Sequence, residues 1–290
     1  MPDTLSMLAR SHGEGEHNTA TDVYGEWAYY CERWRDAQLT DVGRGQASDA
    51  GQSLAAEGHP AALELICASP LTRTLQTAEH IAAQLPEPPP IVALEAVRER
   101  LDGSQPANAR TPLSALKHAH PAVDFSALTE EEDKAFAAVQ TLVEETAGAS
   151  FTEGVDEPAM RTLANYGFAR ADCEQALVTA SRVDDELDRT AAAVKWLREE
   201  AKLEPLFTEW TPYEDDAATA VRVEQFLAWL RGLPEAHILV STHCMFLYTI
   251  FGRHEAMGAV IVCDDDVSPD YFARGERRTV QILFDDSAKL

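Results

Sequence analysis

No apolar run in this sequence approaches the length that a membrane-spanning helix needs, and the N-terminus lacks the basic-then-apolar pattern of a signal peptide. Both absences disfavour a membrane or secreted protein, so we expect a cytoplasmic one with no membrane partner. Cysteine is scarce too, with five scattered residues and no paired ligand spacing. This argues against a disulfide framework or a structural zinc site, and we expect no metal and no cofactor.

Basic residues are few beside acidic ones, because 24 Lys and Arg stand against 49 Asp and Glu, for a formal net charge of −25. Nucleic acid is therefore not expected as a partner, since a phosphate backbone needs a basic stripe to release its counterions. A phosphorylated substrate remains compatible with this charge. A few arginines in a cleft can dominate the local field while the outer surface stays acidic.

The chain has 290 residues, 45% of them hydrophobic, which is enough for one large core or for one core plus a small module. Apolar runs predict strands at 5–10, 63–68, 91–94, 237–240, 260–263 and 279–284, and helical spacing predicts helices at 47–57, 71–85 and 220–233. This alternation predicts an α/β fold, a three-layer sandwich with a mostly parallel sheet. Ligands in such sheets bind beyond the carboxyl ends of the strands.

The first predicted strand runs into Ala9-Arg10-Ser11-His12-Gly13-Glu14-Gly15-Glu16-His17-Asn18. Glycines there let backbone N–H groups turn toward an anion, and a nearby arginine can neutralise it, so the segment is typical of a phosphate-handling loop with a histidine at its centre. Short glycine motifs are unspecific, and an ordinary strand-to-helix turn with an incidental histidine explains this segment equally well.

Further motifs add to this pattern: Asp36-Ala37-Gln38-Leu39-Thr40, Ser69-Pro70-Leu71-Thr72-Arg73, Val97-Arg98-Glu99-Arg100-Leu101, Arg110-Thr111-Pro112 and Ser241-Thr242-His243. Their order and spacing resemble the histidine phosphatase superfamily, the phosphoglycerate mutase-like proteins. The resemblance covers about residues 4–145 and 203–284. No single motif would suffice, but the joint match is specific.

This resemblance implies a phosphatase in which His12 attacks phosphorus and forms a phosphohistidine that water later hydrolyses. It further implies that Arg73 holds the phosphate bidentately, that His243 donates a hydrogen bond to the phosphoryl oxygens, and that Glu99 is the proton donor. Glu95 is a nearby competitor for that last role. Further expected contacts to phosphate or substrate come from Asn18 and Arg110.

Two residues depart from the family pattern. The family has an arginine directly before the first histidine, whereas here Arg10 is followed by Ser11 and only then by His12. Either Ser11 is an extra residue in a bulge, which we favour and which keeps Arg10 as a catalytic residue, or it replaces the arginine and Arg10 points to the other face of the strand. The second departure is Cys244, where a small residue usually follows the second histidine. Its side chain would line or crowd the substrate pocket.

Residues 148–202 interrupt the α/β pattern with apolar spacing typical of three short helices, the first two joined by a glycine turn. The segment resembles a ubiquitin-associated domain, which implies a ubiquitin-binding patch at Tyr166, Gly167 and Phe168, together with Val194 to Leu197. The alternative is an enlarged helical cap over the phosphatase pocket. We therefore predict a discontinuous phosphatase domain, 1–147 and 203–290, with this module inserted.

Three functions are compatible with these residues. The first is a phosphatase acting on a phosphorylated small molecule or a phosphoprotein, with ubiquitin as a recruiting partner. The second is a degenerate phosphatase that binds phosphoproteins or ubiquitinated proteins without efficient turnover, as the Ser11 and Cys244 departures suggest. A phosphoglycerate-isomerising mutase is less favoured, because no sequence feature identifies the closed, water-free site that it needs.

Overall fold

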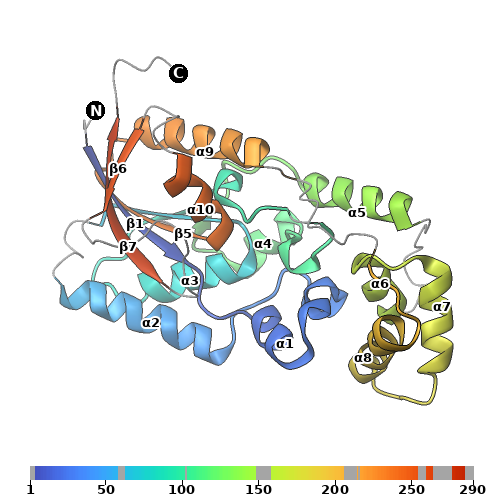
Figure 1. The fold of residues 1–290 in the computed structure, drawn as a ribbon. Helices are drawn as coiled ribbons and strands as arrows, with labels where there is room; N and C mark the ends of the chain where they lie inside the picture. Colours follow the sequence, from blue (N-terminus) through green and yellow to red (C-terminus); the bar gives the residue numbers. More distant parts are fainter. Residues whose placement is uncertain are drawn as a thin grey trace.

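A seven-stranded mixed sheet forms the centre of the computed structural model, which describes residues 4–57, 63–101, 103–147, 158–205, 214, 216–253, 259–263 and 276–284 (Figure 1). The strands lie in the order β4-β3-β2-β5-β1-β7-β6. Their bounds are β1 Thr4–Ser11, β2 Leu65–Ala68, β3 Ile91–Ala93, β4 Val123–Asp124, β5 His237–Thr242, β6 Ala259–Cys263 and β7 Arg277–Phe284. Pairing is parallel from β4 to β1, and β7 is antiparallel to both of its neighbours. The predicted mostly parallel sheet is confirmed.

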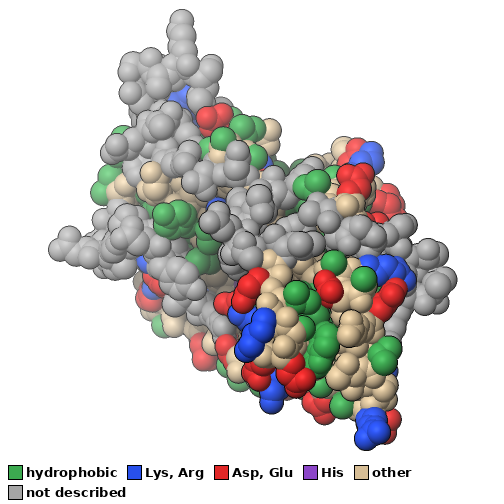
Figure 2. All heavy atoms as spheres, turned by 45° about the vertical axis from the view of Figure 1, so that its right-hand side comes forward, with side chains coloured by type: hydrophobic (Ala, Val, Ile, Leu, Met, Phe, Trp, Pro, Cys, Tyr) green, Lys and Arg blue, Asp and Glu red, His purple; other side chains and the backbone are tan. Residues whose placement is uncertain are grey.

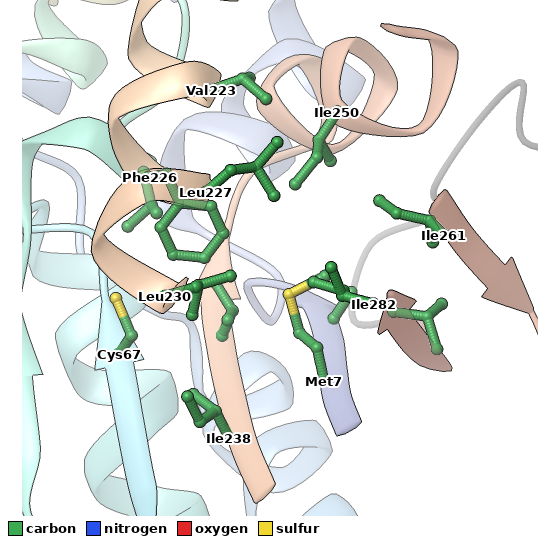
Figure 3. Close-up of a cluster of buried hydrophobic side chains, with 14 of the residues drawn as sticks. Met7, Cys67, Val223, Phe226, Leu227, Leu230, Ile238, Ile250, Ile261 and Ile282 are labelled. Carbon is green, nitrogen blue, oxygen red and sulfur yellow. The ribbon is translucent and has the colours of Figure 1, made fainter. Parts of the chain in front are cut away.

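Helices cover both faces of this sheet and give the predicted three layers. The covering helices are α2 Asp41–Ala56, α3 Thr72–Ala82, α4 Leu113–Ala119, α9 Asp216–Arg231 and α10 Cys244–Arg253, whereas none of the described residues of α1 Glu16–Tyr24 and α5 Lys134–Ala147 belongs to the clusters on the two faces. One hydrophobic cluster joins α2, α3 and α4 to residues such as Leu8 and Ile66. The other joins α9 and α10 to residues such as Met7 and Cys67 (Figure 3). Because neighbouring strand residues alternate between these clusters, both faces of the central strands are apolar.

The central strands place the ends of β1 and β5 side by side. Their register pairs Ser6 with His237 and continues without interruption to Ser11 with Thr242. The chain leaves both strands at the same edge of the sheet, where His12 and His243 follow directly. This is the edge at which ligands bind in parallel sheets, as the sequence predicts.

Three helices follow the last part of α5: α6 Pro158–Asn165, α7 Arg170–Thr179 and α8 Glu186–Lys195, the last continued by a π-helical turn, Trp196–Glu200. They lie beside α1 and α5, away from the sheet (Figure 1). Gly167, with φ 107°, ends α6, and the Phe168 N–H reaches back to the carbonyl of Leu163. Such a left-handed C-terminal cap favours glycine and confirms the predicted turn. The proposed domain boundaries remain a prediction, and residues 148–157 lie outside the described residues.

Sequence periodicity did not predict the helices α1, α4, α5 and α10 or the two-residue strand β4. Within the described ranges, no helix combines the length and the apolar character needed to cross a membrane. A cytoplasmic location remains a prediction.

Candidate active site

His12 stands where β1 ends, and its ring is oriented by its own neighbour. The Nδ1 atom lies 2.7 Å from the carbonyl oxygen of Gly13, and since a carbonyl can only accept, Nδ1 carries the proton. In the neutral ring, Nε2 is then the basic, nucleophilic nitrogen. The side chain is 7% exposed, so little water surrounds this nitrogen.

The loop that carries His12 packs backbone to backbone against the start of α2. A Cβ atom added at Gly13 would lie 2.5 Å from the carbonyl oxygen of Gly43, and one added at Gly43 would lie 2.1 Å from that of Glu14. Both distances are too short for any side chain. The two glycines therefore allow a contact that fixes the position of the His12 loop.

His243 and Arg73 form the other side of the site. The His243 ring lies edge-on to that of His12, with centroids 5.2 Å apart. Arg73 Nη2 donates to His243 Nδ1 over 3.1 Å, so the proton of His243 resides on Nε2, which lies 2.8 Å from Ser69 Oγ. Both ring nitrogens of His243 are thus engaged with protein groups. The expected donation from His243 to a phosphoryl oxygen remains a prediction, and it would need Nε2 to exchange Ser69 Oγ for that oxygen.

Arg73 begins α3 with its guanidinium buried, at 1% exposure. Nη1 donates to the carbonyl of Ala107 at 2.6 Å, and Nη2 donates to Asn108 Oδ1 at 2.8 Å. The Nε atom is buried and finds no hydrogen-bond partner in the part of the chain that the structure describes. An unpaired buried donor beside two histidines is suited to an anion that the protein itself does not supply.

Burial and neighbouring charges shift the pKa values of Arg73 and His243. Burial lowers the pKa of Arg73 to about 10, and the negative charge of Glu99 partly offsets this effect. Burial also lowers the pKa of His243 well below its ordinary value, and the charge of Arg73 lowers it further. At neutral pH Arg73 is therefore charged and His243 is neutral, as its acceptance of a hydrogen bond from Arg73 requires.

Arg10 does not reach this site. Both β1–β5 and β1–β7 keep a regular register through Arg10, and β1–β5 does so through Ser11, so the favoured bulge is wrong. Arg10 instead points to the α2 face, where its Nη2 donates to the carbonyl of Gln46 at 3.1 Å. Because side chains alternate along a strand, Ser11 takes the position next to His12 that the family gives to arginine. The loop has lost one positive charge.

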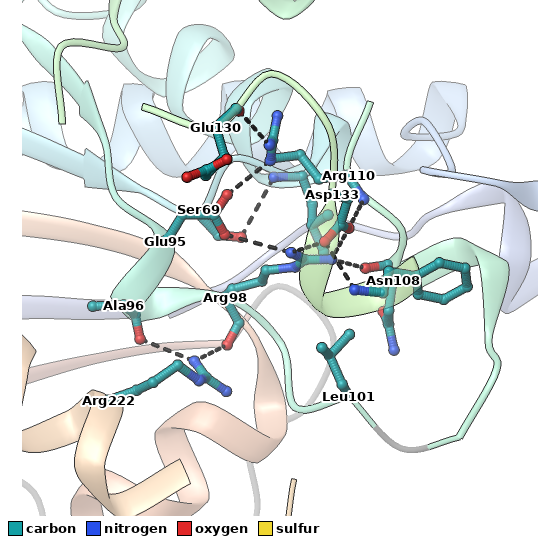
Figure 4. Close-up of polar contacts among 12 residues, drawn as sticks. Ser69, Glu95, Ala96, Arg98, Leu101, Asn108, Arg110, Glu130, Asp133 and Arg222 are labelled. Carbon is teal, nitrogen blue, oxygen red and sulfur yellow. Dashed lines mark hydrogen bonds and ion pairs between the residues drawn. The ribbon is translucent and has the colours of Figure 1, made fainter. Parts of the chain in front are cut away.

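A polar network holds the segment that carries Glu99 (Figure 4). Arg98, 5% exposed, forms a bidentate ion pair with Asp133 and donates to the carbonyl of Asn108. From α9, Arg222 donates to the carbonyls of Ala96 and Arg98 at 3.0 and 2.8 Å. Two backbone carbonyls just before Glu99 are thereby fixed, which limits how far Glu99 can move.

Glu99 and Glu95 have different surroundings. Glu95 lies 2.7 Å from Arg110 Nε and 3.4 Å from Arg98 Nη1, so its carboxylate is committed to an ion-pair network. Glu99 is half-buried, acts electrostatically on Arg73, and lines a cavity of about 350 Å³. Glu95, Arg98 and Arg222 line the same cavity, whereas His12, Arg73 and His243 do not, so the ion pairs of Glu95 are what distinguish it from Glu99. The surroundings favour Glu99 over Glu95 as the proton donor.

Three expected substrate contacts have other partners. The Arg110 guanidinium donates to the carbonyls of Thr111 and of residues 130–132, and these bonds close a loop. Asn18 accepts from the Gly15 N–H at 2.9 Å and caps α1. Cys244 opens α10 and packs against the cluster beneath that helix. Arg110 thus has a structural role, and direct substrate contacts of Arg110, Asn18 and Cys244 remain predictions.

The sequence analysis did not identify two residues that help to build this site, Asp36 and His17. Asp36 is 5% exposed, and its carboxylate accepts from the Thr72 N–H and hydroxyl, both at 2.8 Å, and from the Thr111 N–H at 3.1 Å. It thereby fixes the start of α3, one residue before Arg73. His17 is 5% exposed, with its ring 5.8 Å from that of His12. The motifs around Asp36 and His17 marked both positions without indicating these contacts.

The predicted ubiquitin patch is buried in part. Phe168 is 1% exposed and Leu197 fully buried, so an exposed aromatic surface at Phe168 is wrong. Tyr166, half-buried, packs against Phe168 with ring centroids 5.7 Å apart. Both side chains face a shared core instead of solvent. Within the described ranges, no three His, Cys, Asp or Glu side chains come close enough together to hold a metal ion.

Comparison with known proteins finds similarity to one family. The model of the histidine phosphatase superfamily (branch 1) matches residues 8–143. Phosphoglycerate mutase-like protein 1 of Arabidopsis thaliana is 29% identical over 197 residues, which are 59% of this chain and 66% of that protein. The 2,3-bisphosphoglycerate-dependent phosphoglycerate mutase of Methylobacterium sp. (strain 4-46) is 37% identical over 99 residues, 34% of this chain and 42% of that protein.

The chain thus spans about two thirds or less of the length of these curated relatives. Among solved structures, a mycobacterial glucosyl-3-phosphoglycerate phosphatase aligns over 96% of this chain and 90% of its own, with 13% identity and a TM-score of 0.42. The family match and the curated relatives together support a place for this chain in the histidine phosphatase superfamily.

Proposed function

We propose that this chain is a phosphatase that hydrolyses a phosphomonoester through a phosphohistidine on His12. The observation that carries the proposal is the group formed by His12, His243 and Arg73 at the adjoining ends of β1 and β5. It joins an oriented nucleophile to a buried cation with an unpaired donor. The superfamily match supports a phosphatase-type function independently of this geometry.

The reaction follows from the groups present. His12 Nε2 attacks phosphorus while the bond to the leaving oxygen breaks, and Arg73 Nε donates to a phosphoryl oxygen as charge develops there. Neutral His243 accepts from Arg73 and holds that guanidinium in place. Holding the donors before reaction reduces the reorganisation needed in the transition state.

Glu99 completes the two steps as a proton carrier. It protonates the leaving oxygen in the first step, then takes a proton from the water that attacks the phosphohistidine and breaks the P–N bond. Arg98 and Arg222 fix the backbone around it, so the carboxyl group is delivered by a rigid segment.

The direct test is the trapping of phosphate on His12. His12→Ala should abolish p-nitrophenyl phosphate turnover and the acid-labile phosphoprotein, because it removes the nitrogen that attacks phosphorus. His118→Ala, a change at an exposed histidine on α4, is the matched control and should behave as the unmodified protein. Full turnover in the His12 variant would contradict the mechanism.

A second candidate is a degenerate phosphatase that binds phosphoproteins. Ser11 in place of arginine and Arg10 turned toward α2 favour it, since one phosphate-binding charge is missing. The two functions differ in turnover. Substitution of Ser11 by arginine should raise kcat/KM if the missing charge is what limits the phosphatase, and phosphopeptide binding without turnover would favour the degenerate form.

The substrate is proposed only as a phosphorylated small molecule or a phosphoprotein. Recruitment by ubiquitin remains a prediction, and its contact surface would exclude the buried Phe168. Titration of labelled ubiquitin with the full chain tests it.

A further inference from the structure

The core of the α6–α8 segment is completed by residues from outside it. Its hydrophobic cluster includes Trp27 and Cys31, which belong to or follow the 3₁₀ helix η1 (Glu26–Tyr30) between α1 and α2. Trp27 is 5% exposed and Cys31 2%. The other buried members are Ala159, Met160, Leu163, Phe168, Cys173, Ala176, Leu177, Ala180, Leu187, Ala193, Val194 and Leu197. A separate recruiting module would close its own core, whereas this one shares its core with the N-terminal part of the chain.

Polar and aromatic contacts extend this contact between the α6–α8 segment and η1. Asn165, at the end of α6, donates to the carbonyl of Tyr30 at 3.4 Å and accepts from the Ser104 hydroxyl at 3.1 Å. The rings of Tyr166 and Tyr30 have centroids 5.3 Å apart. Asn165 and Ser104 are both buried. The end of α6 therefore contacts η1 through Asn165 and Tyr166, and Tyr166 is one of the residues of the predicted ubiquitin patch.

The opposite side of η1 faces the histidines. Tyr29 lies with its ring 6.0 Å from that of His17, which in turn lies 5.8 Å from His12. Tyr29 is also among the groups whose charge would act on Arg73. One side of η1 thus packs against α6 and the other lies beside the histidines. Because packed interiors are nearly incompressible, a displacement of α6 would be transmitted through η1 to the site.

We propose that residues 158–200 act as a buttress that fixes η1, so that Tyr29 forms a wall of the phosphoryl site and determines which leaving groups the site accepts. Tyr166 and Asn165 are positioning residues in this arrangement, and Tyr29 is the specificity-determining one. The proposal rests on the phosphatase function proposed above and adds a specificity element to it.

The outer face of the segment agrees with this role. Among its large hydrophobic residues, all of them described, Val178 is the one with a strongly exposed side chain, at 73%. On the side of the molecule that Figure 2 brings forward, hydrophobic side chains are interspersed with acidic and basic ones. The extensive apolar surface of the segment is directed inward, to η1.

Two substrates of different size separate a wall from a general structural role. For p-nitrophenyl phosphate and ethyl phosphate, Tyr29→Ala should change the ratio of the two kcat/KM values by about fivefold to tenfold, the effect of one aromatic contact. Tyr166→Ala should change the ratio in the same direction. Tyr166→Phe should restore it, since the ring is kept, and Val178→Ala on α7 should leave it unchanged. A Tyr166→Ala variant that loses activity equally on both substrates would overturn the proposal.

Amide hydrogen exchange provides a test that does not need turnover. Tyr166→Ala and Asn165→Ala should raise exchange of residues 26–31 about tenfold while α2 keeps its protection, because α2 is held by another cluster. Unchanged exchange at 26–31 would overturn the buttress even in a fully active enzyme. If the protein showed no phosphatase activity but the variants did raise amide exchange at residues 26–31, the proposed function would be refuted. The buttress itself would still hold.

Discussion

Gly43→Ala is the change from which the structure allows the sharpest expectation. The new Cβ would lie 2.1 Å from the carbonyl oxygen of Glu14 and 2.9 Å from that residue's carbonyl carbon and its nitrogen. A carbon and an oxygen normally approach to about 3.3 Å, so the two segments must separate by about 1.2 Å. Glu14 is two residues from His12, and the same carbonyl accepts from the Thr40 N–H at 3.0 Å.

The expected cost has two parts. Overpacking of this kind destabilises a protein by about 1–3 kcal/mol, which a urea unfolding curve would show. A displacement of roughly 1 Å in a catalytic group lowers the rate by about 100-fold, so kcat for p-nitrophenyl phosphate should fall by about that factor. The loss in rate should exceed what partial unfolding explains.

Gly45→Ala is the matched control on the same helix. A Cβ at Gly45 meets no atom within 4 Å, so the substitution should leave turnover unchanged and stabilise the helix by about 0.5–1 kcal/mol. If Gly43→Ala behaved like Gly45→Ala, the contact between α2 and the His12 loop would not be what positions the nucleophile.

Three other changes have definite expected outcomes. Phe168→Ala should lower the free energy of unfolding by about 3–5 kcal/mol, because it empties a buried site, and a variant of normal stability in urea would contradict that burial. Asp36→Ala should cost about 1–3 kcal/mol and lower kcat, since it leaves the Thr72 and Thr111 N–H groups unpaired beside Arg73; thermal unfolding with a turnover assay measures both, and an effect on neither would remove Asp36 from the site. Because the pKa of His243 is depressed in the folded chain, the unfolded chain binds its proton first as pH falls below the ordinary value of 6.5, so the free energy of unfolding should fall from pH 7 to 5. His243→Gln should reduce that fall, and an identical pH profile in the variant would show that His243 is not held neutral.

The part of the site that follows from strand order could be predicted from the sequence. His12 and His243 each come directly after a buried apolar run, and parallel strands end at one edge of the sheet, so their proximity required no knowledge of side-chain contacts. Arg73 follows a third such run. These three residues are the ones that the structure brings together.

Register and long-range polar contacts could not be predicted in the same way. The face on which Arg10 lies depends on pairing with β5 and β7, more than two hundred residues away, and a one-residue difference inverts it. Arg110 carries the charge expected of a phosphate ligand, but its partners are Glu95 and backbone carbonyls, and no motif encodes these contacts. Phe168 has the spacing of an exposed helix-turn aromatic, but it is buried in a cluster that also includes Trp27, which lies far from it in the chain.

The place of β1 in the sheet also constrains how the chain can fold. Both neighbours of β1, the strands β5 and β7, begin only at His237 and Arg277, so β1 has neither of these partners until more than two hundred further residues have been synthesised. Until then both of its edges are open to pairing with other chains. The intervening residues, α6–α8 included, add little to the entropy of closure, since doubling a loop costs only about 0.6 kcal/mol. They lengthen the time between the synthesis of β1 and that of its partner strands. Folding during synthesis should therefore depend on how well β1 is shielded in that interval.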